Sequence, residues 1–118
     1  MSLWNDRPEA WHDVMPGVKR RILTHGHGVM MVLYHIGPNC TFPMHTHPQV
    51  QAGVFIEGSG KFKVGKEVYL VRKGSSYSIP SGVPHELVTD PSSSCVVLDV
   101  FAPERDDLKS ETMTSEKP

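Results

Sequence analysis

Three histidines and a glutamine of this 118-residue chain have the types and the spacing of a metal site. Two of the histidines, His45 and His47, form an H-x-H pair, and Gln51 follows them closely. The third, His85, ends the segment Pro-Ser-Gly-Val-Pro-His. Residues two apart on a β-strand point to the same side, so both imidazoles of such a pair can reach one ion. The sequence therefore predicts a metal centre at these residues.

The predicted ligands carry no charge. Three neutral imidazoles and an amide oxygen leave the charge of a divalent ion uncompensated, which favours Lewis-acid chemistry on an anionic oxygen. Imidazole ligands suit several divalent metals, and we expect Ni, Zn, Fe or Mn. Because a catalytic ion keeps a position open for water or substrate, the expected partner is a small anionic molecule.

A carboxylate interrupts an apolar run near the end of the chain. Asp99 lies between Leu98 and Val100, where an unpaired buried carboxylate would be costly. It either pairs with a buried Lys or Arg or projects into a binding cavity. Phe101 shares the strand face of Asp99, and Arg105 follows near the expected end of the strand. We predict that Asp99, Arg105 and Phe101 form the catalytic part of the site.

Short strands separated by turn residues dominate the chain, which predicts an all-β fold. A second H-x-H pair, His25 and His27, lies in a Gly-rich stretch and is predicted to be a surface turn. A regular run of short strands argues for a closed or sandwiched antiparallel architecture, which protects strand edges. The predicted strands are residues 29–36, 54–57, 61–64, 67–71, 77–79, 86–89 and 95–101.

Composition and charge favour one domain that binds neither nucleic acid nor membrane. The formal net charge is -1, and no basic block is longer than residues 19–21. No apolar stretch approaches membrane-spanning length, so we expect a cytoplasmic protein. We expect residues 1–22 to pack on the barrel or on a homodimer partner, residues 23–107 to form the barrel and residues 108–118 to be a disordered polar tail.

Residues 37–58 and 74–85 resemble the two sequence motifs of the cupin superfamily. The resemblance implies a small single-domain jelly-roll β-barrel in which histidines of both motifs hold one metal. Two positions depart from the general cupin pattern, since Gln51 and Thr89 stand where Glu and Asn are usual.

Flanking residues narrow the resemblance to small cupins related to the pectin-degradation protein KdgF. It covers about residues 18–107, including the Asp-x-Phe-x-Pro-x-Arg stretch at residues 99–105. In that group a Gln replaces the Glu ligand, as at Gln51. Many members have His and Glu where this chain has Gln49 and Val50, which bears on substrate choice.

This resemblance implies the conversion of cyclic 4,5-unsaturated monouronates, released from pectin or alginate, to the linear 5-keto form. Asp99 would move the proton as general acid or base, and Arg105 would clamp the uronate carboxylate.

Two functions of other classes fit the same residues. One is a metal-dependent dioxygenase or other oxidoreductase, since cupins with three His ligands resemble such enzymes too. The other is a non-catalytic module that binds a carboxylated sugar, in which Asp99 only accepts a hydrogen bond. Oxygen uptake would indicate the first, and ligand binding without turnover the second.

Overall fold

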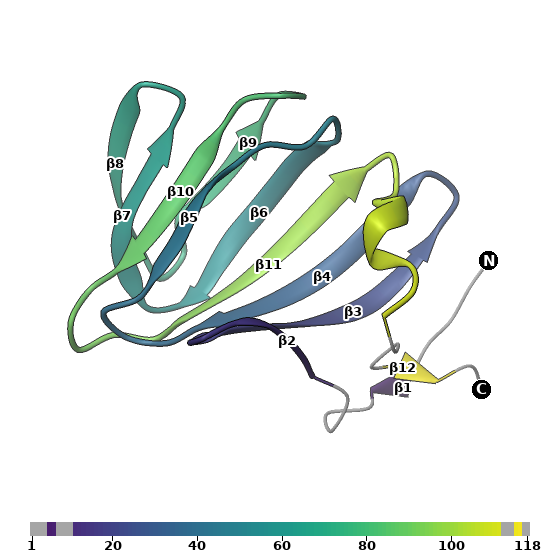
Figure 1. The fold of residues 1–118 in the computed structure, drawn as a ribbon, viewed down its shortest axis with the longest axis horizontal. Helices are drawn as coiled ribbons and strands as arrows, with labels where there is room; N and C mark the ends of the chain where they lie inside the picture. The colour runs from purple at the N-terminus through teal and green to yellow at the C-terminus, as the bar shows by residue number, and fades with distance from the viewer. Residues whose placement is uncertain (1–4, 7–10, 112–114, 117–118) are drawn as a thin grey trace.

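Two antiparallel sheets packed face to face make up most of the molecule (Figure 1). This computed structural model describes residues 5–6, 11–111 and 115–116. The larger sheet of the described residues has the order β2-β3-β4-β11-β6-β9, with β2 at His12–Met15, β3 at Val18–Gly26, β4 at Val29–Ile36, β11 at Cys95–Ala102, β6 at Val50–Glu57 and β9 at Ser76–Ile79. The smaller has the order β5-β10-β7-β8, with β5 at Thr41–His45, β10 at His85–Thr89, β7 at Ser59–Val64 and β8 at Glu67–Arg72.

The predicted all-β fold is confirmed by this arrangement. Two short strands, β1 (Asn5–Asp6) and β12 (Ser115–Glu116), pair with each other apart from the main sheets. The only described helix is η1, a 3₁₀ turn at Asp106–Leu108. No helix in the described part of the chain is long and apolar enough to span a membrane.

Alternating side chains of the central strands fill the space between the sheets. Along β11, every second residue is buried, and Asp99 and Phe101 are 5% and 1% exposed. The predicted shared face of these two residues is therefore confirmed. The apolar residues that surround them in the core are Val18, Ile22, Met30, Val32, Tyr34, Ile36, Phe55, Phe62, Ile79, Leu87, Cys95, Val97 and Leu108.

Three strands of the two main sheets, β2, β3 and β5, were not predicted from the sequence. β3 has charged residues between its buried Val18 and Ile22, so apolar and polar residues do not alternate regularly along it. β5 contains Pro43, which argues against a central strand, but β5 is the edge of its sheet and pairs only with β10. The H-x-H pair His25 and His27 lies at the β3–β4 turn as predicted.

The predicted domain boundaries need correction at both ends. β3 pairs with β4 from Val18 onward, so the barrel sheet begins before residue 23. At the other end, Leu108 is buried in the core and Glu111 forms an ion pair with Arg20 of β3. An apolar anchor and a partly buried charge pair thus order residues that were predicted to be disordered. Residues 1–4, 7–10, 112–114 and 117–118, which complete those predicted segments, lie outside the described residues.

Candidate metal centre and its cavity

The three histidines predicted as ligands come together at one end of the sandwich. His45 ends β5, and His85 begins β10 directly opposite it in the strand register. His47 lies in the turn between β5 and β6, so the H-x-H pair does not share a strand as expected. One ring nitrogen from each of the three lies within 4.8 Å of the others. The cluster is confirmed, although strand register and a turn, instead of strand alternation, produce it.

Each of these imidazoles is oriented by a main-chain carbonyl. A carbonyl oxygen can only accept a hydrogen bond, so each Nδ1 carries the proton and donates. This tautomer leaves the Nε2 lone pair available, which is the arrangement that metal-binding histidines adopt. The distances from Nδ1 to oxygen are 2.8 Å for His45 to Pro43, 3.1 Å for His47 to Gln49 and 3.0 Å for His85 to Val83.

Gln51 completes a set of three nitrogens and one oxygen. Its side-chain oxygen lies 2.8 Å from Nε2 of His47, and its amide nitrogen donates to the Tyr77 hydroxyl at 3.2 Å. The Nδ1 of His47 already donates to a carbonyl, so a neutral ring presents a lone pair to the oxygen of Gln51. Two ligands at right angles, each about 2.1 Å from one ion, lie about 3 Å apart. The distance between these two atoms therefore fits two ligands of one ion.

A buried nitrogen without a partner supports the same fit. His85 is 2% exposed, and its Nε2 has no hydrogen-bond partner among the described residues. Burial lowers the pKa of His85 to about 4 and also lowers that of His45. Both rings are neutral near pH 7, which is the form that coordinates a metal. The residues present thus fit a divalent ion.

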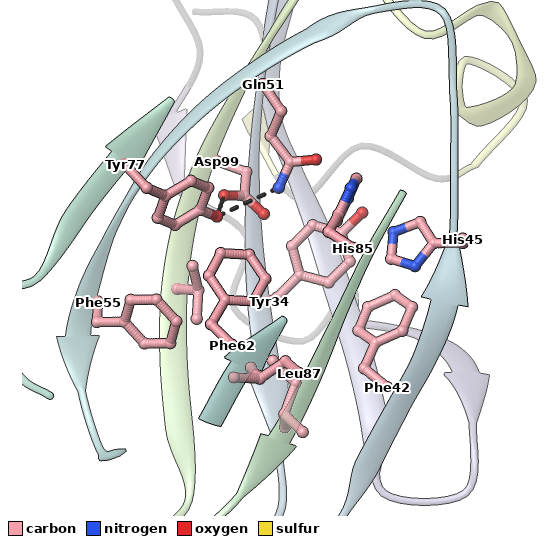
Figure 2. Close-up of a pocket in the computed structure, with 12 residues that line it drawn as sticks. Tyr34, Phe42, His45, Gln51, Phe55, Phe62, Tyr77, His85, Leu87 and Asp99 are labelled. Atoms are coloured by element: carbon pink, nitrogen blue, oxygen red, sulfur yellow. Dashed lines mark hydrogen bonds between the residues drawn. The ribbon is translucent and has the colours of Figure 1, made fainter. Parts of the chain in front are cut away.

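Three of the candidate ligands, His45, Gln51 and His85, open onto a cavity between the two sheets (Figure 2). The free space inside it is about 30 Å³, which holds one or two water molecules. The wall is largely aromatic and aliphatic, and its polar groups gather at the end that holds the histidines. The lining residues are Tyr34, Ile36, Phe42, His45, Gln51, Phe55, Phe62, Tyr77, His85, Leu87, Val97 and Asp99.

Asp99 projects into this cavity from β11, as predicted. Burial raises the pKa of its carboxyl to about 7, while hydrogen bonds from Tyr77 and Gln51 act against the shift. The Tyr77 hydroxyl donates to Oδ1 of Asp99 (Figure 2). Among the described residues, Asp99 forms no ion pair with a Lys or Arg side chain. A carboxyl with this environment can exchange a proton near neutral pH.

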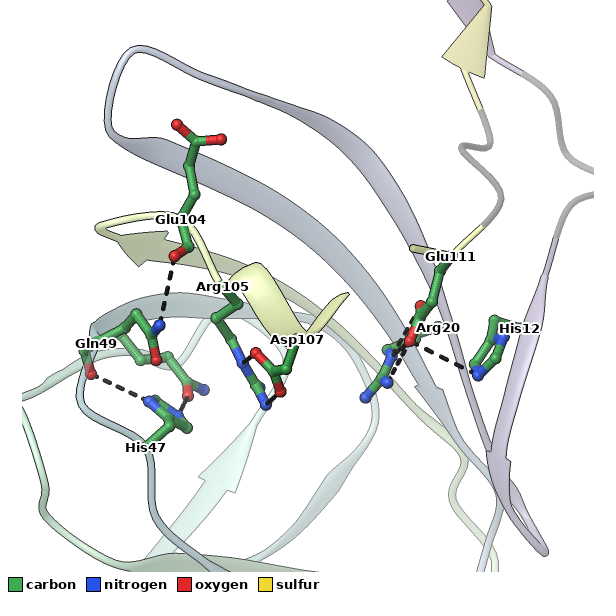
Figure 3. A network of polar contacts seen from close by, with 9 residues as sticks. His12, Arg20, His47, Gln49, Glu104, Arg105, Asp107 and Glu111 are labelled. Atoms are coloured by element: carbon green, nitrogen blue, oxygen red, sulfur yellow. Dashed lines mark hydrogen bonds and ion pairs between the residues drawn. The ribbon is translucent and has the colours of Figure 1, made fainter. Parts of the chain in front are cut away.

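Phe101 contacts one of the histidines, and Arg105 lies over Phe101. The Phe101 ring meets the His47 ring edge-on, with 5.2 Å between the ring centres. The Arg105 guanidinium lies 5.0 Å from the centre of the Phe101 ring. Neither side chain lines the cavity itself. Arg105 pairs with Asp107, so the structure places the predicted carboxylate clamp next to the site with its donors engaged (Figure 3).

Tyr77 was missed as a site residue by the sequence analysis. It falls in a predicted strand and shares a face with Ile79, which is buried. Residues two apart on a strand face the same side, so the Tyr77 hydroxyl lies inside the barrel, where it needs a polar partner. This spacing could have identified Tyr77 as a site residue. Gln49 and Val50, where this chain departs from many relatives, differ in exposure: Gln49 is buried and Val50 is exposed.

Comparisons with known proteins identify relatives of this fold. The Dickeya dadantii "Pectin degradation protein KdgF" is 27% identical over 104 residues, which are 87% of this chain and 94% of that protein. The structure of KdgF from Halomonas sp. superposes with a TM-score of 0.80 at 26% identity, covering 92% of this chain and 98% of the other. An RmlC-like cupin from Shewanella frigidimarina gives a TM-score of 0.77 at 26% identity, covering 83% and 86%.

These similarities extend over most of the chain. Residues 32–101, more than half of the chain, match the family described as "Cupin domain". That match includes the three clustered histidines, Gln51 and Asp99. This chain is a member of the cupin family and is similar to KdgF.

Proposed function

We propose that this chain is a metal-dependent enzyme that converts cyclic 4,5-unsaturated monouronates to their linear 5-keto form. The observation that carries the proposal is the placement of Asp99 and Tyr77 in the same cavity as Gln51 and two of the three clustered histidines, His45 and His85. The similarity to the two KdgF proteins supports the choice of substrate.

The metal would be held by His45, His47, His85 and Gln51. When bound, a divalent ion supplies Lewis-acid stabilisation of a negative oxygen. The ligand side chains are neutral, so an anionic uronate meets no opposing charge from them.

The reaction is an isomerisation in which one proton leaves an oxygen and one reaches a carbon. The C1 hydroxyl loses its proton, the bond from C1 to the ring oxygen breaks, and C4 gains a proton as the enol becomes a ketone. Asp99 is the carboxyl in the cavity that can take the first proton and supply the second. The Tyr77 hydroxyl holds Oδ1 of Asp99, which fixes the position of the carboxyl during both transfers.

The apolar wall of the cavity affects how strongly charged groups interact inside it. Phe42, Phe55 and Phe62 give the cavity an apolar lining beside its polar groups. Exclusion of water strengthens the interaction between a charged substrate and the polar groups around it.

The test follows the enol ether of the substrate by its ultraviolet absorbance. Purified protein, with its metal content measured, is incubated with the unsaturated monouronate, and Asp99→Asn serves as the matched variant. We expect the band to decay faster than in buffer with the wild-type protein and to lose about a hundredfold or more in rate with the variant. Decay no faster than buffer with metal bound rejects the substrate.

The same experiment separates the two other functions. Oxygen consumption by iron-loaded protein would indicate an oxidoreductase. Uronate binding without turnover, unchanged in Asp99→Ala, would indicate a binding module.

A further inference from the structure

Arg105 holds a carboxylate of its own chain. Its Nε lies 3.3 Å from Oδ1 of Asp107, and its Nη2 lies 2.8 Å from Oδ2 (Figure 3). Two parallel hydrogen bonds from one edge of a guanidinium to one carboxylate are the geometry by which Arg recognises a carboxylate ligand. Asp107 thus occupies the edge that a substrate carboxylate would use.

The guanidinium lies one ring away from the candidate metal centre. It stacks over Phe101, and the same Phe101 ring meets the His47 ring edge-on. A carboxylate bound by Arg105 would therefore lie about one aromatic ring away from His47.

The two partners of this ion pair differ in how firmly they are held. The Arg105 side chain is 13% exposed, whereas that of Asp107 is 62% exposed. Asp107 belongs to the short turn η1 and has no other ion-pair partner among the described residues. An incoming carboxylate can therefore replace Asp107 without moving Arg105 from Phe101.

We propose that Asp107 competes with a uronate carboxylate for Arg105 and so sets how tightly uronates bind. This inference rests on the proposed function and adds to it the role that the resemblance gives Arg105, the binding of the uronate carboxylate. The competition lowers the affinity for every uronate by the same factor. Removal of the Asp107 charge therefore tightens the binding of uronates.

The matched pair of variants is Asp107→Asn and Asp106→Asn. Asp106 lies in the same turn, is 89% exposed and pairs with Lys109 instead of Arg105. The probe is galacturonate, a saturated uronate that cannot react, and its affinity is measured by calorimetry at low salt. Because the Arg105–Asp107 pair is exposed on one side, we expect Asp107→Asn to bind about two- to fivefold more tightly than wild type, with Asp106→Asn unchanged.

Two results would overturn the proposal. If Asp107 only orients Arg105, its removal weakens galacturonate binding. If Arg105 takes no part, binding is equal in wild type and both variants, or undetectable in all of them. Turnover of the unsaturated uronate by the wild-type protein is measured separately. A wrong substrate assignment is therefore distinguished from a wrong proposal about Asp107.

Discussion

Tyr77 and Asp99 meet over Gly53. β6 lies between β9 and β11, and Gly53 is the register partner of Tyr77 on one side and of Asp99 on the other. The two side chains reach across the glycine to form their hydrogen bond. A Cβ on residue 53 would overlap both the carboxylate and the hydroxyl.

Gly53→Ala is expected to separate the proposed catalytic pair. The methyl group forces Asp99 and Tyr77 apart, which should lower the free energy of unfolding by about 1–3 kcal/mol and reduce turnover. Urea unfolding and the ultraviolet assay measure the two effects. Gly37→Ala is the control, because a Cβ there meets only ordinary contacts, and its stability should change by less than about 0.5 kcal/mol. Equal effects in both variants would contradict the steric role of Gly53.

Tyr77→Phe removes the hydroxyl and keeps the ring. The carboxyl of Asp99 and the amide of Gln51 then lose a common partner, so we expect kcat to fall about 10- to 100-fold with a folded protein. Tyr69→Phe is the control, since Tyr69 is 52% exposed on the edge strand β8. An unchanged kcat in Tyr77→Phe would show that the hydroxyl does not position Asp99.

His85→Ala should abolish stoichiometric metal binding. It removes one of three clustered nitrogens and leaves a cavity in its place, so metal affinity should fall by at least about 100-fold. Metal content after dialysis, measured by mass spectrometry, reports the effect. His27→Asn is the control: His27 lies in the β3–β4 turn with a φ of 56°, which Asn tolerates. Full metal occupancy in His85→Ala would remove this residue from the ligand set.

Glu111→Gln tests whether the C-terminal segment stabilises the barrel. The Arg20 and Glu111 side chains are 14% and 7% exposed, and the pair joins residues far apart in the sequence (Figure 3). Loss of the charge should lower the free energy of unfolding by about 1–3 kcal/mol. Lys73→Gln, which breaks an exposed pair with Glu57, should cost less than about 0.5 kcal/mol. If both variants unfold alike, the segment contributes little.

Much of the site was readable from residue spacing, because cupin motifs place their histidines by strand register. Asp99 and Phe101 were placed on the inner face by the alternation of β11 alone. The need for a glycine at position 53 could not be predicted from the sequence, since it depends on the pairing of three strands. Nor was the pair of Arg20 with Glu111, because its partners are 91 residues apart and neither stands in a motif.

The main-chain anchoring of the three imidazoles has a consequence for how this site can diverge. Every Nδ1 is fixed by a carbonyl, which any residue type supplies, so the ligand geometry is independent of the side chains at those anchoring positions. Met44 and Val50 are exposed beside the ligands and can be exchanged without loosening an imidazole. Substitutions at such exposed positions can therefore accumulate while the ligand cluster is inherited intact.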